Sequence, residues 1–352
     1  MARKARKPDR VRVGIVGVGI GSIHARGYAR CGRAQVVALC DLDTDRAQRL
    51  ATEHGIERIY SDYRVMLAEE KLDAVSVCTP NALHEPVAVA AFEAGCHVLC
   101  EKPLSTSAAS AKRMLDAARR SRRRFMVGMN NRFRGDTQVL RGYIEAGELG
   151  SIYYARCGWI RRKGIPGMGS WFTRKELSGG GPLIDIGVHA FDVTWYLMGN
   201  PKPVAVFGAT YAQFGPRGLG GGGWGVAVAG GGYDVEDLAA AQVRFENGAT
   251  LCLEASWAQH CQGDRLYSEV YGDSGGATLE PLRVFTDHRG RPVDISPHAP
   301  QVDGHEAEVA HFVDCVLNDR EPISTGEQGV EVMKVLDAIY ESAQSGASVM
   351  IE

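Results

Sequence analysis

The 352-residue chain has no long hydrophobic run and no excess of either charge. No apolar run approaches the roughly 18 residues that a membrane-spanning helix needs, so a membrane protein is not predicted. There are 40 Lys+Arg against 42 Asp+Glu, a net charge of −2. Proteins that bind nucleic acid or anionic membranes are usually basic. Neither nucleic acid nor a membrane is therefore predicted as a partner.

Cysteine pairing motifs are also missing. The nine cysteines are odd in number and scattered, and no two are spaced as C-x-x-C. This pattern supports neither a zinc knuckle nor a disulfide framework, and it predicts a reducing, cytoplasmic location. Residues 1–10 are basic without an apolar core, so they do not resemble a secretory signal. We expect them to form a mobile tail.

Length and patterning predict two domains of an α/β chain. Apolar residues make up 45% and charged residues 23%, as in globular proteins, and 352 residues suffice for two domains. The expected strands of the first part are Val11–Val18, Gln35–Asp41, Ala74–Cys78, His97–Cys100 and Phe125–Met129. Helical patterns alternate with these apolar strands, which predicts a doubly wound parallel sheet over residues 1–132.

Residues 133–352 have a different pattern. The expected strands here are Ile152–Ile160, Val204–Tyr211, Val235–Arg244, Ala249–Trp257 and Arg265–Tyr271. They alternate apolar and polar residues, and Asn247-Gly248 is a hairpin signal, so we expect a large, mostly antiparallel open sheet with helices on one face. The glycine-saturated stretch Gly218–Tyr233 predicts a flexible surface loop.

A glycine-rich turn follows the first strand and precedes a helix. Its residues are Gly17, Gly19, Ile20, Gly21 and Ser22. Such a turn lets the backbone approach a pyrophosphate, whose charge the helix N-terminus binds. Ser22 stands where the dinucleotide motif has its third glycine, so a purely structural glycine turn is the alternative.

Asp41 strengthens the dinucleotide interpretation. It ends the second strand, where a carboxylate can bond the adenosine ribose and repel a 2′-phosphate. NAD is therefore the expected cofactor, although Arg46 lies close enough to leave NADP open. The alternative, that Asp41 caps the next helix, fits Asp43 better.

Polar turns follow the next two strands. They are Thr79-Pro80-Asn81, with His84 nearby, and Glu101-Lys102-Pro103. Open α/β sheets bind ligands at the carboxyl ends of their strands, so both turns are candidates for cofactor contacts.

The motifs together resemble the glucose-fructose oxidoreductase/inositol dehydrogenase/MocA family. The motifs that carry the resemblance are GVGIGSIH, Cys40-Asp41, TPNALHEP, EKP, Asn130–Phe133 and GGGPLIDIGVH at 179–189. The resemblance implies a Rossmann domain bound to NAD(P) and a second domain whose sheet carries a homodimer or homotetramer contact. It also implies that Lys102, Asp185 and His189 form the catalytic group, with Asn81, Glu101 and Asn130 positioning the nicotinamide and Arg132 contacting substrate. Members typically oxidise a ring hydroxyl of a sugar or cyclitol.

The residues themselves favour the same chemistry at Asp185 and His189. The apolar run after Gly181 predicts a helix beginning near Pro182, on which these two residues are i and i+4 neighbours. Histidine is suited to take a hydroxyl proton, and a lysine ammonium to stabilise alkoxide charge. The alternatives are a surface ion pair, a buried structural histidine, or a metal site that also uses Asp192. We expect no metal, since no further ligand cluster stands out.

A loop before this helix offers substrate contacts. Trp171 presents a flat face for a sugar ring, and Arg174 can bond hydroxyls or a carboxylate. Ordinary loop packing is the alternative.

The predicted function is NAD-dependent hydride transfer from a ring hydroxyl of a sugar, glycoside or cyclitol. Two other functions stay open: a redox-neutral lyase that oxidises its substrate transiently, and a non-catalytic dinucleotide-binding regulator. Retention of Lys102, Asp185 and His189 together argues against the regulator.

Overall fold

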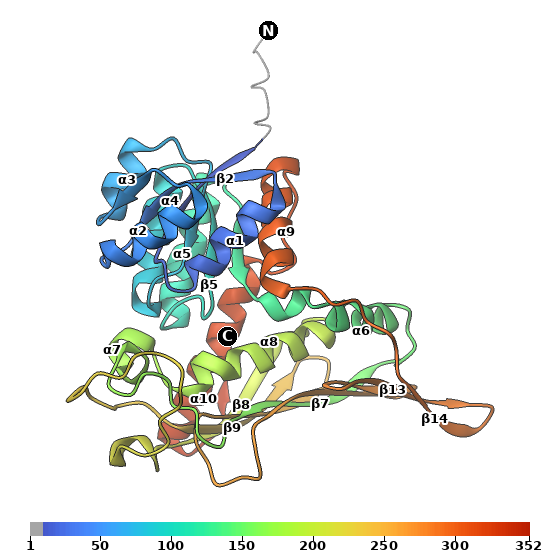
Figure 1. Cartoon of the computed structure of the whole chain (residues 1–352). Coiled ribbons are helices and arrows are strands. Elements are labelled where there is room, and N and C mark those ends of the chain that lie inside the picture. Colours follow the sequence, from blue (N-terminus) through green and yellow to red (C-terminus); the bar gives the residue numbers. More distant parts are fainter. Residues whose placement is uncertain (1–9) are drawn as a thin grey trace. The chain divides into compact units, whose positions relative to one another are not determined.

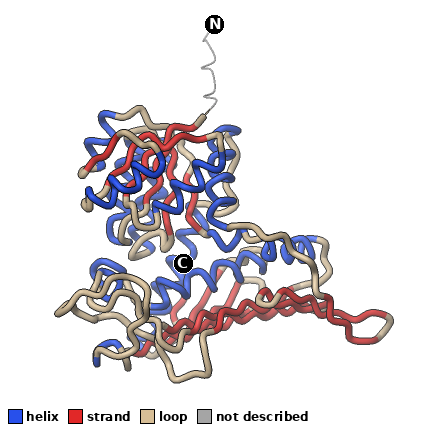
Figure 2. Tube along the Cα trace, viewed as in Figure 1, coloured by secondary structure: helices blue, strands red, loops and turns tan. Residues whose placement is uncertain are grey.

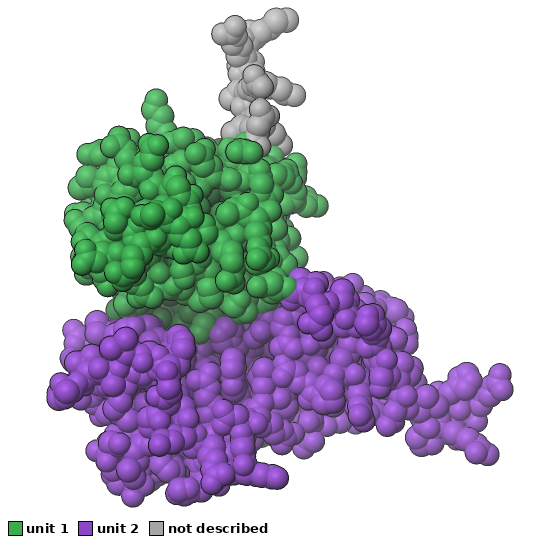
Figure 3. All heavy atoms as spheres, in the orientation of Figure 1, with its two compact units in different colours: residues 1–105, 109–130, 303–330 green, residues 106–108, 131–302, 331–352 purple. Residues whose placement is uncertain are grey.

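The computed structural model of the chain describes residues 10–352, which form two compact units (Figure 3). Unit 1 comprises residues up to 105, 109–130 and 303–330, and unit 2 comprises 106–108, 131–302 and 331–352. The predicted division into 1–132 and 133–352 differs from these units chiefly at residues 303–330, which belong with the first unit, and at residues 106–108, which belong with the second. The predicted mobile tail lies, apart from Arg10, outside the described residues.

Unit 1 contains a six-stranded parallel sheet (Figures 1 and 2). Its strands are β1 (Val11–Val16), β2 (Ala34–Cys40), β3 (Arg58–Tyr60), β4 (Ala74–Val77), β5 (His97–Glu101) and β6 (Phe125–Gly128). Their order is β3-β2-β1-β4-β5-β6, and every neighbouring pair is parallel. This is the order of doubly wound dinucleotide-binding sheets, whose ligands bind where the order reverses, beyond β1 and β4. The doubly wound prediction is confirmed.

Helices cover this sheet. They are α1 (Gly21–Cys31), α2 (Thr44–His54), α3 (Tyr63–Glu69), α4 (His84–Glu93), α5 (Ala108–Ser121) and α9 (Gly304–Asn318). β4 and β6 are buried at every residue, as expected for a sheet covered on both faces. α9 returns from far along the chain and packs on α1, where a Cβ on Gly27 would lie 3.1 Å from Val309.

Unit 2 is built on a nine-stranded mixed sheet. Its strands are β7 (Ile152–Ile160), β8 (Pro203–Tyr211), β9 (Leu238–Phe245), β10 (Thr250–Ser256), β11 (Arg265–Gly272), β12 (Gly275–Leu279), β13 (Leu282–His288), β14 (Arg291–Ile295) and β15 (Val349–Met350). Their order is β14-β13-β12-β11-β7-β10-β9-β8-β15, and among the neighbouring strands of this sheet in the described residues only β7 and β10 are parallel. The prediction of a large, mostly antiparallel sheet is confirmed, and so is the hairpin at Asn247-Gly248, where Gly248 has φ +86°.

The helices of unit 2 gather on one face of its sheet (Figure 1). They are α6 (Gly135–Glu145), the short α7 (Lys175–Ser178), α8 (Val188–Leu197) and most of α10 (Gly326–Ser345). α8 packs on β7 and β11, and Thr194 of α8 donates a hydrogen bond to Ser268 of β11 at 2.8 Å. None of the helices within residues 10–352 is long and apolar enough to cross a membrane.

The glycine-saturated stretch Gly218–Tyr233 lies at the surface as predicted, but its backbone is paired. Gly222 donates to the Ile165 carbonyl at 2.8 Å, and Gly167 donates to the Trp224 carbonyl at 2.8 Å. A Cβ on Gly231 would overlap the backbone of Gly169. The glycines therefore permit close approach of two backbones, a role that the predicted flexible loop did not include.

Candidate active site

The glycine turn between β1 and α1 has the backbone of a phosphate-binding loop. Gly17 has φ +92°, and a Cβ there would overlap the carbonyl of Cys78. Ser22, the departure from the expected motif, donates its hydroxyl hydrogen to the Gly19 carbonyl at 2.8 Å and so closes the turn. α1 has no acidic residue in its first turn to compete with a bound anion. The turn therefore fits a pyrophosphate.

Asp41 lies beside this turn, at the end of β2. Its carboxylate accepts the backbone N–H of Val18 at 2.7 Å and of Asp43 at 2.9 Å, so it anchors the turn as well as offering acceptors for a ribose. Asp43 caps α2 by accepting the N–H of Arg46 at 2.9 Å, as predicted. The Arg46 guanidinium lies 3.8 Å from the place that a Cβ on Gly19 would take. A cation therefore stands beside the glycine turn.

The turn after β4 carries Thr79, Pro80 and Asn81. The Thr79 hydroxyl oxygen is buried and has no hydrogen-bond partner among the described residues. Buried polar atoms are normally satisfied, so an orphaned hydroxyl beside a glycine cradle fits a bound dinucleotide. Asn81 is buried at the start of a 3₁₀ turn, Asn81–Leu83.

The structure corrects the predicted cofactor contact of His84. This side chain is buried, with Nδ1 2.9 Å from the Pro103 carbonyl oxygen and Nε2 2.9 Å from the Thr79 carbonyl oxygen. Burial lowers the pKa of His84, and the two carbonyl contacts act in the opposite direction. Because both ring nitrogens face backbone oxygens, His84 joins two turns instead of offering a nitrogen to a ligand.

Glu101 and Lys102 form the end of β5 and the turn after it. Glu101 Oε1 lies 2.9 Å from His24 Nε2, and Oε2 accepts the backbone N–H of Lys102 at 3.1 Å. Burial would raise the pKa of Glu101, but the contact with His24 and the nearby Lys102 and His305 together lower it. A buried carboxylate thus holds the backbone of the predicted catalytic lysine. Asn130, at the end of unit 1, contacts His305 at 3.5 Å.

In unit 2, Asp185 and His189 lie at the start of the helix that contains α8. The helix begins at Pro182 as predicted, but its first turn, Leu183–Gly187, is π-helical, a feature common at functional sites. Between residues 183 and 195, Asp185 and His189 alone keep partial exposure, and the others are buried. The two positions are i and i+4 neighbours on a stretch that is otherwise buried, and their predicted catalytic role stays a prediction.

Three side chains that the sequence did not single out support this turn. Trp257, fully buried at the end of β10, donates its indole N–H to Asp185 Oδ2 at 3.0 Å. Glu236 accepts the backbone N–H of Gly181 at 2.9 Å and of Leu183 at 3.1 Å, and the hydroxyl of Tyr340 at 3.0 Å. Burial raises the pKa of Glu236, while these hydrogen bonds oppose the rise. The sequence gives one sign of this role: Glu236 is a carboxylate near the start of the expected strand Val235–Arg244.

Arg132 and Asp192 form a buried ion pair within unit 2. Arg132 Nε lies 2.8 Å from Asp192 Oδ2, Nη2 lies 2.6 Å from Oδ1, and the side chains are 1% and 2% exposed. This bidentate geometry corrects two interpretations: Arg132 faces α8 instead of substrate, and Asp192 is bound to a guanidinium instead of joining Asp185 and His189 as a metal ligand.

Trp171 and Arg174 are both partly exposed on the loop before α7. The Trp171 ring lies on Phe172 with centroids 3.7 Å apart, and Phe172 in turn packs edge-on to Trp224 at 4.8 Å. Arg174 lies 3.9 Å from Glu176. The structure leaves both side chains reachable, and their predicted contact with substrate stays a prediction.

Comparison with known proteins decides the family. Residues 11–129 match a family model described as "Oxidoreductase family, NAD-binding Rossmann fold". Residues 141–351 match the companion model, described as "Oxidoreductase family, C-terminal alpha/beta domain". The chain belongs to the glucose-fructose oxidoreductase/inositol dehydrogenase/MocA family.

Individual relatives cover nearly the whole chain. D-glucoside 3-dehydrogenase of Escherichia coli is 36% identical over 345 residues, 96% of this chain and 97% of the relative. Levoglucosan dehydrogenase of Pseudarthrobacter phenanthrenivorans is 30% identical over 323 residues, 84% of this chain and 82% of the relative. A structure of levoglucosan dehydrogenase with NADH and levoglucosan has a TM-score of 0.86 at 26% identity, covering 97% of this chain and 99% of that one.

Family membership confirms the predicted oxidoreductase class and the NAD cofactor. In unit 1 the residues fit that cofactor without rearrangement of the glycine turn: the cradle at Gly17, the acceptors of Asp41 and the hydroxyl of Thr79 are in place.

Proposed function

We propose that this oxidoreductase transfers hydride from a ring hydroxyl of a sugar, glycoside or cyclitol to NAD, with His189 as general base and Lys102 polarising the reacting oxygen. The observation that carries the proposal is the accessible Asp185–His189 pair on an otherwise buried turn. The relatives named for glucoside and levoglucosan oxidation support the substrate class.

The cofactor supplies a nicotinamide that accepts hydride when it is bound. The protein's part is to hold the dinucleotide with Gly17, Asp41 and Thr79, and to handle the hydroxyl proton. Removing that proton as hydride leaves requires a base, and imidazole titrates closest to neutral pH. The ammonium of Lys102 stabilises the negative charge that develops on the oxygen.

Asp185 acts beside His189. The indole of Trp257 fixes one carboxylate oxygen from the sheet side, and the Trp159 ring lies 5.8 Å from the imidazole of His189 between centroids. Glu236 holds the backbone at the start of the same turn. Asp185 is thus oriented by a buried donor, so it can bind a substrate hydroxyl or orient His189 with little loss of side-chain freedom.

A turnover assay tests the function. The purified enzyme is given NAD⁺ or NADP⁺ with a panel of methyl glucosides, levoglucosan and inositols, and NADH absorbance is followed alongside chromatography of the sugars. Net NADH formation is the expected result. Release of a sugar from its glycoside without net NADH would favour the redox-neutral lyase, and cofactor binding without turnover on any compound would favour the regulator.

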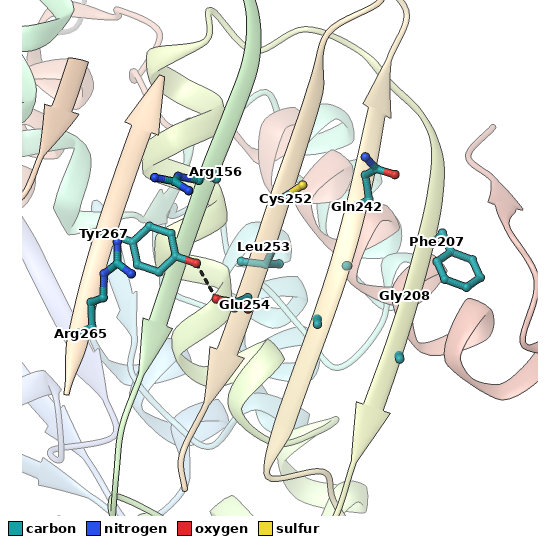
Figure 4. Close-up of a pocket in the computed structure, with 12 residues that line it drawn as sticks. Arg156, Phe207, Gly208, Gln242, Cys252, Leu253, Glu254, Arg265 and Tyr267 are labelled. Carbon is teal, nitrogen blue, oxygen red and sulfur yellow. Dashed lines mark hydrogen bonds between the residues drawn. The ribbon is translucent and has the colours of Figure 1, made fainter. Parts of the chain in front are cut away.

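We also propose that two copies associate through the open face of the unit 2 sheet, in the cytoplasm. This face is hollowed into a shallow pocket lined by Phe207, Gln242, Glu254 and Tyr267 among others (Figure 4). Phe207 is 54% exposed there and Tyr211, four residues along the same strand, is 50% exposed, and an apolar patch shared by several exposed groups marks a contact surface. All nine cysteines are free, which supports a reducing compartment.

Light scattering coupled to size-exclusion chromatography tests this association. Phe207→Glu should lower the molecular mass toward that of one chain, because it places a charge in the contact. Leu42→Glu, at a site 85% exposed in unit 1, is the matched control and should leave the mass unchanged. An oligomer that survives Phe207→Glu, or a monomeric wild type, would contradict the proposal.

A further inference from the structure

Two buried histidines contact the turn that carries Lys102, and they come from different helices. His84, in the first turn of α4, reaches the Pro103 carbonyl, one residue after Lys102, at 2.9 Å. His24, in α1, reaches the carboxylate of Glu101, one residue before Lys102, at 2.9 Å. Both side chains are essentially inaccessible, at 1% and 0% exposure. The turn is therefore held on both sides of the lysine by imidazoles that cannot themselves touch substrate.

His84 connects this turn to the one after β4. Its other nitrogen, Nε2, lies 2.9 Å from the Thr79 carbonyl oxygen. Carbonyl oxygens only accept hydrogen bonds, so a neutral ring donates to one of them and a protonated ring donates to both. An apolar residue at this position would remove the donor that a neutral ring supplies and would leave one of these carbonyls without it, a costly change that the two turns would relieve by moving apart.

His24 connects the same turn to the helix that follows the glycine turn. Glu101 divides its two oxygens between His24 Nε2 and the backbone N–H of Lys102, the latter at 3.1 Å. On its other side, His24 Nδ1 lies 3.1 Å from Ser76 Oγ, which in turn lies 2.7 Å from the Tyr28 hydroxyl. A continuous chain of buried hydrogen bonds thus leads from α1 to the Lys102 backbone.

We propose that His84 and His24 are positioning residues, which fix the Lys102 turn so that the ammonium meets the reacting oxygen. The proposal rests on the role given to Lys102 above. Charge stabilisation by a fixed group depends on sub-ångström placement, and a displacement of about 1 Å can lower the rate by about 10²-fold. Neither histidine needs to contact substrate or cofactor to have this effect.

The test compares the histidine variants in two backgrounds, wild type and Lys102→Met, using the full-length enzyme at saturating substrate and NAD⁺. His84→Leu should lower kcat about 10- to 100-fold when Lys102 is present, with a much smaller change in substrate KM. In the Lys102→Met background it should cause almost no further loss, because a residue that acts only through the lysine has nothing left to position. NADH binding and the melting temperature are measured on every variant.

The conservative variant and a matched control sharpen the test. His24→Leu should behave like His84→Leu, whereas His24→Gln keeps a donor for Glu101 and should recover most of the lost kcat. If His84→Leu fails to fold, His24→Leu, His24→Gln and His84→Gln still test whether the histidines act through Lys102. His84→Gln keeps one donor. His97→Leu removes a partly buried imidazole from the other end of β5, and it should leave kcat within about twofold of its background.

The outcomes separate the two proposals. Equal losses of kcat for the histidine variants with and without Lys102 would overturn the positioning role and leave the role of Lys102 standing. So would full activity in His84→Leu and His24→Leu. A Lys102→Met enzyme with unchanged kcat would instead overturn the role of the lysine, and the positioning proposal with it.

Discussion

The two units carry their site residues in different ways. In unit 1 the groups proposed to hold the cofactor lie on turns after β1, β2, β4 and β5, where backbone geometry and carbonyl contacts define the site. In unit 2, Asp185 and His189 lie on one helical turn, and side chains from distant strands, Trp257 and Glu236, hold that turn in place. Unit 1 thus relies on the backbone of its turns, which a few buried side chains such as His84 hold in place, whereas unit 2 relies on side chains brought together from distant strands.

The strongest way to test this contrast is to remove the side chain that carries the chemistry of unit 2. His189→Ala should lower kcat by about 10²–10⁴, because it removes the general base. In the oxidative direction the wild-type kcat should rise with pH as the base loses its proton, and that limb should vanish in the variant. Profiles of kcat against pH, followed by NADH absorbance, check both points.

Lys102→Met is the companion variant, with an expected loss in kcat of about 10²–10³. If Lys102 and His189 act on one oxygen as proposed, the double variant should lose less than the product of the two single losses. If His189→Ala has a nearly normal kcat and an unchanged pH limb, Asp185 and His189 have only a structural role.

The buried ion pair of unit 2 should show its effect in stability. Arg132→Met leaves the Asp192 carboxylate buried without its partner, and should lower the free energy of unfolding by about 3–5 kcal/mol. The double variant Arg132→Met/Asp192→Leu should recover much of that loss. Urea denaturation measures both, with Arg174→Met as an exposed control expected to change stability by less than about 0.5 kcal/mol. If Arg132→Met raises the substrate KM and leaves the stability unchanged, Arg132 contacts substrate after all.

In unit 1 a single charge should set cofactor choice. Asp41→Ala removes a carboxylate that accepts hydrogen bonds and repels a 2′-phosphate, and it should shift the ratio of kcat/KM for NAD⁺ over NADP⁺ toward NADP⁺ by about 10- to 100-fold. Asp41→Asn keeps an acceptor for the Val18 N–H while removing the charge, so it separates loop anchoring from repulsion. If both variants leave the ratio unchanged, Arg46 and not Asp41 decides cofactor choice.

The smallest effect is expected for a single supporting hydrogen bond. Trp257→Phe removes the indole donor to Asp185, a bond worth about 1 kcal/mol, and should lower kcat/KM several-fold. Trp195→Phe removes a comparable bond, from Trp195 to the Pro201 carbonyl at 2.7 Å, elsewhere in unit 2. The two variants should lose similar stability, but only Trp257→Phe should lose activity. If the two variants have equal activities, Trp257 supports only the fold and not the active site.

The same contrast explains what could be predicted from the sequence. Gly17, Asp41 and the EKP turn were found because a backbone-built site requires glycine, proline and polar residues at fixed distances along the chain. The sequence did not predict the roles of Trp257 and Glu236 or the partner of Arg132. Their contacts join residues 55 to 72 positions apart, and a single sequence does not show which distant residues meet. The strands β12–β14 and the short β3 were missed for a related reason: each is stabilised by its neighbours more than by its own residues.

The return of residues 303–330 to unit 1 bears on how the chain is made. α9 covers α1 and is joined to it by ion pairs such as Arg26–Glu306 at 3.4 Å, yet it is separated from the rest of unit 1 by residues 131–302. The ribosome adds about 5–20 residues per second. At that rate, α9 is synthesised roughly ten to thirty seconds after the strands of the Rossmann sheet. During that interval the apolar side of α1 around Gly27 is uncovered, and most of unit 2 is synthesised before unit 1 can finish folding.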